Sequence, residues 1–459
     1  MCLPRCAEET CPSGSACIAG VCTPSREATA AVSIDPSTHY QSLIGFGASL
    51  AHDEELIVNR PNAQRLYDAM FAESGFDIIR ARNRYEPGNT AALGSLVEIV
   101  SAASARLDRK PLLFLSGGSP PASLKANGSR GCSMAETDCT LIRNAQGGFD
   151  YAGFGEHWRN SLEAYEAAGI HPDLVSVQSN PDWLPEDTAA EACLLLPEEG
   201  VEAVTGPGGQ VIEADFAGYA EAMDAVAASV SSLPSQYSFS GPEVGSAAML
   251  EAYSRALTHV DTFAYHLDGA DPSTIVAEES QVVSALSGQP AKPSIQSAMR
   301  ADGLGTAILT HYALTVANSS GYIQQQFVAS SFDESSAVLI GANDQTIEKL
   351  PAYHALTHFA RFTDPGWVRV AATTDSAGVL ASAWSSPGDD SLTIVLVNPT
   401  DEPSDVKLVI PATVPVPDTR VVRTVFSGVE RSAELGVLSC ERVIRLPGHA
   451  IVTIAASRE

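Results

Sequence analysis

Between about Leu43 and Leu356, short apolar runs alternate with longer stretches whose apolar residues recur at helical spacing, such as Phe154–Gly169. Each apolar run is followed by loop residues and then by a helix-compatible segment. Strands that alternate with helices in this way predict parallel β/α units. The predicted strands are Phe76–Arg82, Pro111–Ser116, Leu174–Ser179, Phe263–Leu267 and Pro293–Ser297.

The pattern changes after Trp367, where β-type runs such as SLTIVLV and DVKLVIP recur with turn residues between them. Such spacing is typical of an antiparallel β-sandwich. A similar run, AAVSIDP, starts at Ala30, ahead of the alternating region. We therefore expect residues 30–42 to supply the first strand of the same sandwich.

The charge balance restricts the partners of this chain. It has 27 basic and 55 acidic residues, a formal charge of −28. Such a surface repels phosphate backbones and anionic headgroups, so neither nucleic acid nor a membrane is an expected partner, and a polyanionic substrate is disfavoured. No apolar stretch of about 18 residues is present, so no membrane-spanning helix is expected. No metal-ligand spacing is found, and we expect neither a metal nor another cofactor.

Cysteines crowd the first residues of the chain, at Cys2, Cys6, Cys11, Cys17 and Cys22. Dense cysteines among Gly, Pro and Ser favour disulfides and an oxidising compartment, whereas a metal site is disfavoured because no His and no C-x2-C pair occurs there. We expect residues 1–28 to be a disulfide segment of an extracellular protein whose export signal precedes this sequence. The binding partner of this segment is left open.

Four cysteines lie elsewhere in the chain. Cys132 and Cys139 flank the short segment SMAETD, and this spacing predicts a disulfide that closes a short loop between the predicted strands Pro111–Ser116 and Leu174–Ser179. Cys193 and Cys440 are expected to be buried thiols, or the partner of the unpaired cysteine in the first segment.

Four long stretches, in order, resemble glycoside hydrolase family 30, the xylanase and glucosylceramidase relatives. They are Gln41–Ser49, Ser119–Gly128, Tyr151–Trp183 and Tyr353–Val370. The resemblance implies a (β/α)8 TIM barrel over residues 43–356 with an associated C-terminal antiparallel β-sandwich over residues 357–459. It also implies a retaining glycosidase mechanism, in which two carboxyl groups about 5–5.5 Å apart act at the C-terminal ends of two strands.

Both of those carboxyl groups are replaced in this chain. In the family's QNEPD motif, Asn180 stands at the position of the acid/base glutamate, and an amide has no proton with a usable pKa to donate. Ser179 replaces the preceding asparagine. In the segment that carries the nucleophile, Ala298 stands at the glutamate position, and a methyl group cannot form a glycosyl ester.

The aromatic platforms that hold sugar rings in the family are also replaced. The resemblance matches them to Gly118, Ser123 and Gln325, so Trp183 is the one tryptophan expected near the cleft. The remaining candidates for the cleft lie at or just after strand ends, where Arg80 would brace the floor. These candidates are Arg80, Gln178, Ser179, Asp182, Trp183, Glu243, Tyr265, His266, Asp268, Gln296 and Tyr322.

The sequence is compatible with three functions. The first is a secreted, catalytically degenerate homologue with a groove for a β-linked polysaccharide of the xylan, glucuronoxylan or β-glucan class. The second is an active O-glycosyl hydrolase with relocated carboxylates, Glu243 with Asp182 or Asp268, for which a separation of about 6.5–9.5 Å would indicate an inverting enzyme. The third is a non-catalytic structural or interaction module that acts through the cysteine-rich segment.

Overall fold

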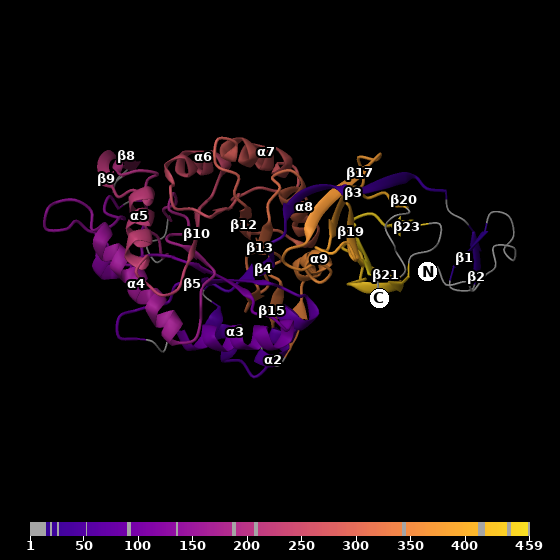
Figure 1. The fold of residues 1–459 in the computed structure, drawn as a ribbon, viewed down its shortest axis with the longest axis horizontal. Helices are drawn as coiled ribbons and strands as arrows, with labels where there is room; N and C mark the ends of the chain where they lie inside the picture. The colour runs from indigo at the N-terminus through magenta and orange to yellow at the C-terminus, as the bar shows by residue number, and fades with distance from the viewer. Residues whose placement is uncertain are drawn as a thin grey trace.

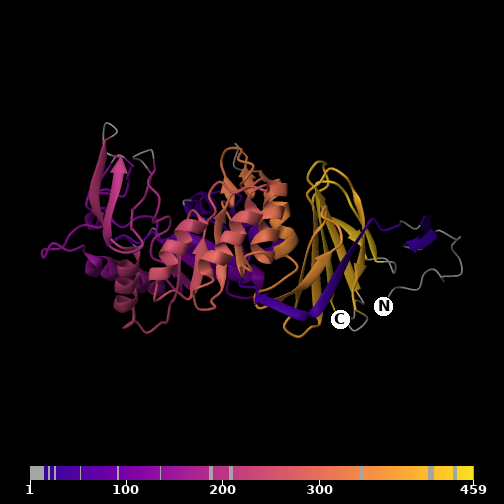
Figure 2. The same cartoon turned by 90° about the horizontal axis from the view of Figure 1, so that it is seen from above.

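The chain forms two lobes that lie side by side, a barrel of strands and helices and a β-sheet domain (Figures 1 and 2). This arrangement confirms the predicted fold class. The computed structural model describes residues 15–18, 21–24, 27–51, 53–89, 93–134, 136–185, 190–205, 210–341, 346–411, 418–437 and 442–457.

Eight parallel strands close the barrel, with β13 hydrogen-bonded to β4. Their order around the barrel is β4-β5-β6-β7-β10-β11-β12-β13, which is also their order along the chain. The strands are β4 (Gly45–Ser49), β5 (Ile78–Arg82), β6 (Leu112–Ser116), β7 (Leu174–Ser176), β10 (Ser238–Val244), β11 (Thr262–Tyr265), β12 (Ser294–Met299) and β13 (Gly321–Gln324).

The barrel interior changes from apolar to polar along the strands. Side chains that alternate along each strand bring Ile78, Phe114 and Ile295 together in one buried cluster. Two residues further along β5 and β6, Arg80 and Ser116 point to the same interior. The floor of the barrel's C-terminal end is therefore polar and rests on an apolar layer.

Helices cover the outside of the barrel, and two of the long ones begin with an aspartate that caps the first turn. The Asp150 side chain accepts a hydrogen bond from the Gly153 N–H at the start of α4, and Asp302 does the same for Gly305 at the start of α8. The helices are α1 (Glu54–Val58), α2 (Ala63–Tyr67), the π-helix η1 (Asp68–Glu73), α3 (Gly94–Leu107), the 3-10 helix η3 (Ala122–Leu124), α4 (Tyr151–Ala167), α5 (Tyr219–Val230), α6 (Ala247–Ala256), α7 (Ile275–Leu286), α8 (Gly303–Thr315) and α9 (Pro351–Ala360). None of the helices in the described part of the chain is long and apolar enough to cross a bilayer.

The second lobe is a nine-stranded, mostly antiparallel sheet. Strand β3 (Ala30–Ser42) lies inside it, paired antiparallel with β17 (Val368–Thr374) and parallel with β20 (Ser404–Val409). The first strand of the lobe thus joins strands more than 300 residues later. The others are β18 (Leu380–Ser385), β19 (Ser391–Asn398), β21 (Asp418–Val425), β22 (Ala433–Gly436), β23 (Val443–Leu446) and β24 (Ala450–Ser457).

Helix α9 connects the two lobes through a buried histidine. His358 lies 2.8 Å from the Thr453 hydroxyl through Nδ1 and 2.9 Å from the Thr424 hydroxyl through Nε2. Burial lowers the pKa of His358 to about 3, so the ring is neutral at physiological pH.

Shorter strands lie outside the two main sheets. The β8–β9 hairpin extends from the end of the barrel farthest from the sheet domain (Figure 2). These strands are β1 (Ser15–Ile18), β2 (Val21–Pro24), β8 (Gly200–Thr205), β9 (Val211–Phe216), β14 (Val328–Ala329), β15 (Val338–Ile340) and β16 (Ile347–Lys349).

Cys132 and Cys139 form the predicted disulfide, with their Cα atoms 5.7 Å apart. Cys193 is a buried free thiol, and burial raises its pKa to about 12, which disfavours the thiolate form that a nucleophile needs. The side chains of residues 1–26 and of Cys440 lie outside the description, and the disulfides predicted for the first segment remain predictions.

A buried carboxyl behind the barrel wall predicts a specific pH dependence of stability. Glu279 on α7 is fully buried and accepts a hydrogen bond of 2.8 Å from the Tyr265 hydroxyl. Burial raises the pKa of Glu279 to about 8. Between an unfolded pKa of about 4.3 and this value the folded chain holds a proton that the unfolded chain releases. The contribution of this carboxyl to the free energy of unfolding is therefore fully present below the unfolded pKa. It decreases by about 1.4 kcal/mol per pH unit as the pH rises toward the folded pKa.

We expect Glu279→Gln to remove this pH dependence, because the amide carries no titrating proton and can still accept from Tyr265. Urea unfolding at pH 5 and pH 7.5 should show that the wild type loses on the order of 3 kcal/mol more than the variant over that interval. Glu156→Gln, an exposed change on α4, is the matched control and should follow the wild type. If the free energies of unfolding of the wild type and of Glu279→Gln changed equally with pH, Glu279 would not be a buried, protonated carboxyl.

Candidate functional site

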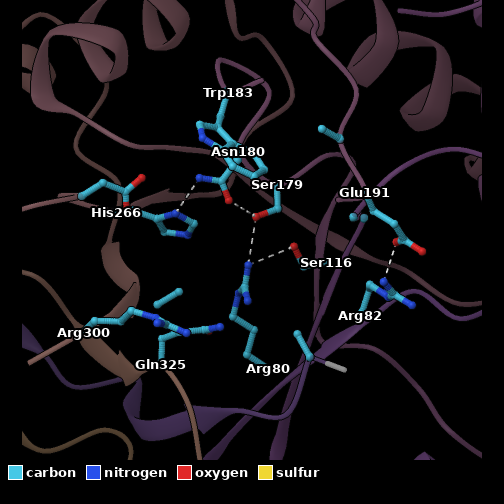
Figure 3. Close-up of a pocket in the computed structure, with 16 residues that line it drawn as sticks. Arg80, Arg82, Ser116, Ser179, Asn180, Trp183, Glu191, His266, Arg300 and Gln325 are labelled. Carbon is cyan, nitrogen blue, oxygen red and sulfur yellow. Dashed lines mark hydrogen bonds and ion pairs between the residues drawn. The ribbon is translucent and has the colours of Figure 1, made fainter. Parts of the chain in front are cut away.

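A pocket of about 260 Å³ opens at the C-terminal ends of the barrel strands, where the sequence predicts the cleft. Figure 3 shows its polar side chains pointing toward one another from several strand ends. The pocket is lined by Ala51, Arg80, Arg82, Ser116, Gly117, Gly118, Ser179, Asn180, Trp183, Glu191, Ala192, His266, Asp268, Ala298, Arg300 and Gln325.

Asn180 lies in the loop that follows β7, at the acid/base position inferred from the resemblance. Its backbone is left-handed, with φ of 47°, a conformation that asparagine tolerates better than most residues. Its side-chain nitrogen lies 3.2 Å from His266 Nδ1, and its oxygen accepts from the Ser179 hydroxyl at 3.1 Å. The position thus holds a hydrogen-bonded amide that lines the pocket.

Ala298, at the nucleophile position, lies at an irregularity in β12 where the pairing with β13 shifts between Ser297 and Met299. Its φ is 98°, in a region that residues with a Cβ rarely adopt. Glu243 lies at a similar shift in β10 and has φ of 55°. The barrel therefore keeps strained strand ends around the pocket even though one of them carries only a methyl group.

Glu243 lies beneath the pocket, not on its surface. Its carboxylate is fully buried and forms an ion pair of 2.8 Å with Arg80. Ser116 donates a short hydrogen bond to it, and Ser297 donates one of 3.3 Å. Burial alone would raise the pKa of Glu243, but the positive charge of Arg80 and the hydrogen bonds from His266 and Ser116 outweigh it and hold the pKa far below its usual range. A carboxylate so stabilised cannot serve as a general acid.

His266 connects this buried pair to the pocket. Its Nδ1 faces the Asn180 amide, and its Nε2 lies 3.6 Å from a Glu243 oxygen. Nδ1 can accept from the amide, whereas Nε2 faces the carboxylate from beyond normal hydrogen-bond length. The histidine is 3% exposed and still contributes to the pocket lining, where the sequence predicts a cleft residue.

An ion pair occupies the space beside Gly118, one of the positions where the family has an aromatic platform. A Cβ atom added at Gly118 would lie 2.9 Å from Arg82 Cδ and 3.4 Å from a Glu191 oxygen. Arg82 and Glu191 are paired with each other and line the pocket. This pocket wall is therefore polar, and an aromatic ring at residue 118 would displace the pair.

The two aspartates considered as relocated carboxylates lie in different places. Asp268 is exposed and lines the pocket. Asp182 does not line it, and its Oδ2 accepts from the Gly245 N–H at 3.2 Å. Burial raises the pKa of Asp182, with no neighbouring positive group strong enough to reverse the shift. The structure therefore does not bring Glu243 and Asp182 together on the pocket surface.

Three predicted cleft residues belong to the opposite face of the barrel wall. Tyr265 hydrogen-bonds Glu279 on α7, and Tyr322 packs in the core shared by strands and helices. Gln296 is buried between the inward-facing Ile295 and Ser297. The expectation that these three face the cleft is corrected, because side chains alternate along a strand and the neighbouring residues take the inner face. Gln178 is also buried and donates to the Gly118 carbonyl at 2.8 Å, behind the pocket wall.

Sequence reasoning missed three charged residues of the pocket, Arg82, Glu191 and Arg300. Arg82 could have been found, because it lies two residues after Arg80 on the same strand and so shares its face. Glu191 lies in a loop after the Asn180 motif, and no sequence signal placed it. The one metal-type cluster in the described residues is Cys132, Glu136 and Cys139, whose two sulfurs are joined to each other in the disulfide.

The barrel, the pocket at its strand ends and the attached sheet domain together define a glycoside hydrolase type of fold. No family model and no curated protein sequence matches the chain. Solved structures do match it over nearly its whole length. Xylanase Xyn30A from Clostridium acetobutylicum, of glycoside hydrolase family 30 subfamily 8, superposes with a TM-score of 0.68 at 19% identity, covering 93% of this chain and 100% of that one.

Two further matches broaden the comparison. A conserved exported protein from Bacteroides fragilis gives a TM-score of 0.75 at 14% identity, covering 93% of this chain and 100% of that chain. An endo-β-1,6-glucanase gives 0.62 at 14% identity, covering 95% of this chain and 96% of that one. The chain therefore has the fold of the family 30 glycoside hydrolases, as the motif resemblance predicts.

Proposed function

We propose that this chain is an extracellular protein that binds a β-linked polysaccharide in the barrel pocket without hydrolysing it. The observation that carries the proposal is the chemistry of the two positions that should hold the catalytic carboxyls. Asn180 and Ala298 both line the pocket, as an amide and a methyl group. Neither can donate a proton to a leaving oxygen or form a glycosyl ester.

The carboxylates that remain near the pocket are held in other interactions or lie at its edge. Glu243 is ion-paired with Arg80, and Glu191 is ion-paired with Arg82. Asp268 is exposed on the lining. A retaining mechanism requires one carboxyl that is protonated and a second that is free to attack, and a carboxylate held by an arginine meets neither requirement well.

The glycan assignment is supported by the neighbours and by the polarity of the pocket. Structural neighbours include a xylanase and a β-1,6-glucanase. The pocket offers amide, hydroxyl and guanidinium groups for sugar hydroxyls, and Trp183, 45% exposed, offers a ring face on the lining. Export is supported by the Cys132–Cys139 disulfide and by the match to an exported protein.

The test combines a turnover assay and a binding assay on the same protein. The chain is incubated with xylan, glucuronoxylan, β-1,6-glucan and aryl glycosides, and both released reducing ends and retention on the insoluble polymers are measured. We expect retention on at least one polymer and no product. Trp183→Ala should weaken retention by about tenfold or more, whereas Val429→Ala, a 98% exposed position in the sheet domain, should not change it.

Sustained product formation would instead support the relocated-carboxylate hydrolase. Of the carboxyls named for that hydrolase, Asp268 lines the pocket, so Asp268→Asn would then abolish the activity. Retention that survives deletion of residues 1–26 would argue against binding through the cysteine-rich segment.

A further inference from the structure

A second groove lies beside helix α8, where the barrel faces the sheet domain (Figure 1). Its volume is about 280 Å³, close to that of the barrel pocket. Leu304, Ile308 and Tyr312 line it from α8 and are spaced four residues apart, so they lie on one face of the helix. Leu380 on β18 and Pro399 just after β19 line it from the sheet domain. Both lobes therefore build the groove, which follows α8 for about 12 Å.

Two loops at the C-terminal end of the barrel separate this groove from the barrel pocket. In the loop after β11, Asp268 lines the pocket and Pro272 lines the groove. In the loop after β12, Arg300 lines the pocket and Asp302 lines the groove. Two residues of chain span at most about 7 Å, so the two linings are close neighbours at this point. A chain molecule that leaves the pocket across these loops therefore enters the groove.

The groove offers ring faces and apolar side chains to a ligand. Tyr312 is half-buried, and its ring packs edge-on against the His311 ring with the two centroids 5.0 Å apart. Pro272 and Pro399 add two further rings to the lining. Sugar rings carry C–H groups on their faces and pack against aromatic and aliphatic surfaces of this kind. The lining is therefore suited to a row of sugar units.

Asp302 supplies a hydrogen-bond acceptor in the groove. Its Oδ1 accepts from the Gly305 N–H at 2.6 Å, which holds the side chain at the start of α8. Its second oxygen can accept from sugar hydroxyls, because both oxygens of an ionised carboxylate have acceptor sites. No lysine or arginine is among the residues that line the groove, all of which the structure describes. The groove therefore favours a neutral ligand with hydroxyl groups over an anionic one.

We propose that this groove is a second polysaccharide-binding site, in which neutral sugar units of a chain held in the barrel pocket pack on Tyr312 and donate hydrogen bonds to Asp302. This inference rests on the proposed function and extends the bound length of the glycan across the junction of the two lobes. Once one part of the chain is held in the pocket, binding of the next part in the groove is intramolecular, which raises the affinity for long chains. A short oligosaccharide that fills the pocket alone gains nothing from the groove.

The test compares ligands of two lengths from two neutral series. Oligosaccharides of β-1,4-linked xylose and of β-1,6-linked glucose, each with two or with six sugar units, are titrated into the full chain by calorimetry. We expect the six-unit ligand of at least one series to bind about tenfold or more tightly than its two-unit ligand. Trp183→Ala, in the pocket, should lower the affinity for both lengths.

Variants of the groove should remove only the gain in affinity with length. Tyr312→Ala should bring the affinity for the six-unit ligand to within about twofold of that for the two-unit ligand. Tyr312→Phe keeps the ring and should keep the gain. Asp302→Asn should reduce the gain, and its amide oxygen can still accept from Gly305. The matched control is Tyr237→Ala, since Tyr237 is also half-buried and stacks on a histidine, with ring centroids 5.2 Å apart, and this variant should bind like the wild type.

The outcomes separate this inference from the proposed function. Equal affinity of the wild type for both lengths would overturn the groove and leave binding in the pocket intact. A gain with length that survives in Tyr312→Ala would place the added sugar units elsewhere and would also overturn it. Binding of none of the ligands would overturn the inference. If the insoluble polymers also failed to retain the chain, the proposed function would be overturned as well.

Discussion

Replacing Arg80 by methionine is expected to lower the free energy of unfolding by about 3–5 kcal/mol. The Glu243 carboxylate is 0% exposed, and the Arg80 guanidinium lies 2.8 Å from it. Without that charge, the hydrogen bonds from Ser116 and Ser297 remain, but burial dominates and the carboxyl must either take up a proton or stay charged in the barrel interior.

Urea unfolding of matched variants measures this effect. The control is Arg106→Met, which removes an ion pair with Asp68 at the surface, where Asp68 is 50% exposed. That change should cost no more than about 1 kcal/mol. The double variant Arg80→Met with Glu243→Leu should recover most of the loss, because no charge is then left buried. A cost for Arg80→Met no larger than for Arg106→Met would show that Glu243 is not held as an ion beneath the pocket.

Restoring both carboxyl groups is expected to produce the largest change in activity. The double variant Asn180→Glu with Ala298→Glu places carboxyls at two positions that already line the pocket, on backbone that already has the strand-end conformation. The side chain added at residue 298 would lie in the same pocket as Arg300, whose charge favours the ionised form that a nucleophile needs.

We expect hydrolysis of aryl β-glycosides by this variant at about a hundredfold or more above the matched amide variant, Asn180→Gln with Ala298→Gln. The amide variant has nearly the same shape and no carboxyl. The rate should still stay about a hundredfold or more below that of an active enzyme, since no aromatic platform fixes the sugar ring. Equal hydrolysis rates in the two variants would show that carboxyls at residues 180 and 298 do not act on the scissile bond.

The structure also changes how the platform must be rebuilt. Gly118→Trp alone is not expected to help, because the ring would collide with the Arg82–Glu191 pair. We expect the tryptophan at residue 118 to raise the hydrolysis rate of the carboxyl-restored variant only when the Arg82–Glu191 pair is removed as well. A higher hydrolysis rate on adding Gly118→Trp while the Arg82–Glu191 pair is kept would contradict this steric argument.

The sequence predicted the strands and the places of Asn180 and Ala298 at strand ends, because both depend on local patterns. The apolar runs at Phe76–Arg82 and Pro293–Ser297 contain β5 and most of β12, and the order of motifs along the chain placed Asn180 and Ala298 at strand ends. Strand alternation could have assigned Gln296 and Tyr265 to the outer face, since Ile295 and Ala264 beside them are apolar residues of the barrel interior.

The remaining features depended on contacts between distant segments. Glu191 meets Arg82 across more than 100 residues, and Glu243 meets Arg80 across more than 160. No spacing in a single sequence reveals such pairs. These pairs neutralise Arg80 and Arg82, two of the three arginines that line the pocket.

The place of strand β3 constrains the order in which this chain can fold during synthesis. Strand β3 cannot pair until β17 and β20 are translated more than 300 residues later, whereas the last of the eight barrel strands is complete at Gln324, before β17 begins at Val368. Contacts that close such long loops form slowly, and domains fold as units once their own residues have emerged from the ribosome. The barrel is therefore free to assemble first, with β3 held as an unpaired edge that could pair with another chain. The sheet domain closes last, when β17 and β20 pair with β3 across the barrel sequence that separates them.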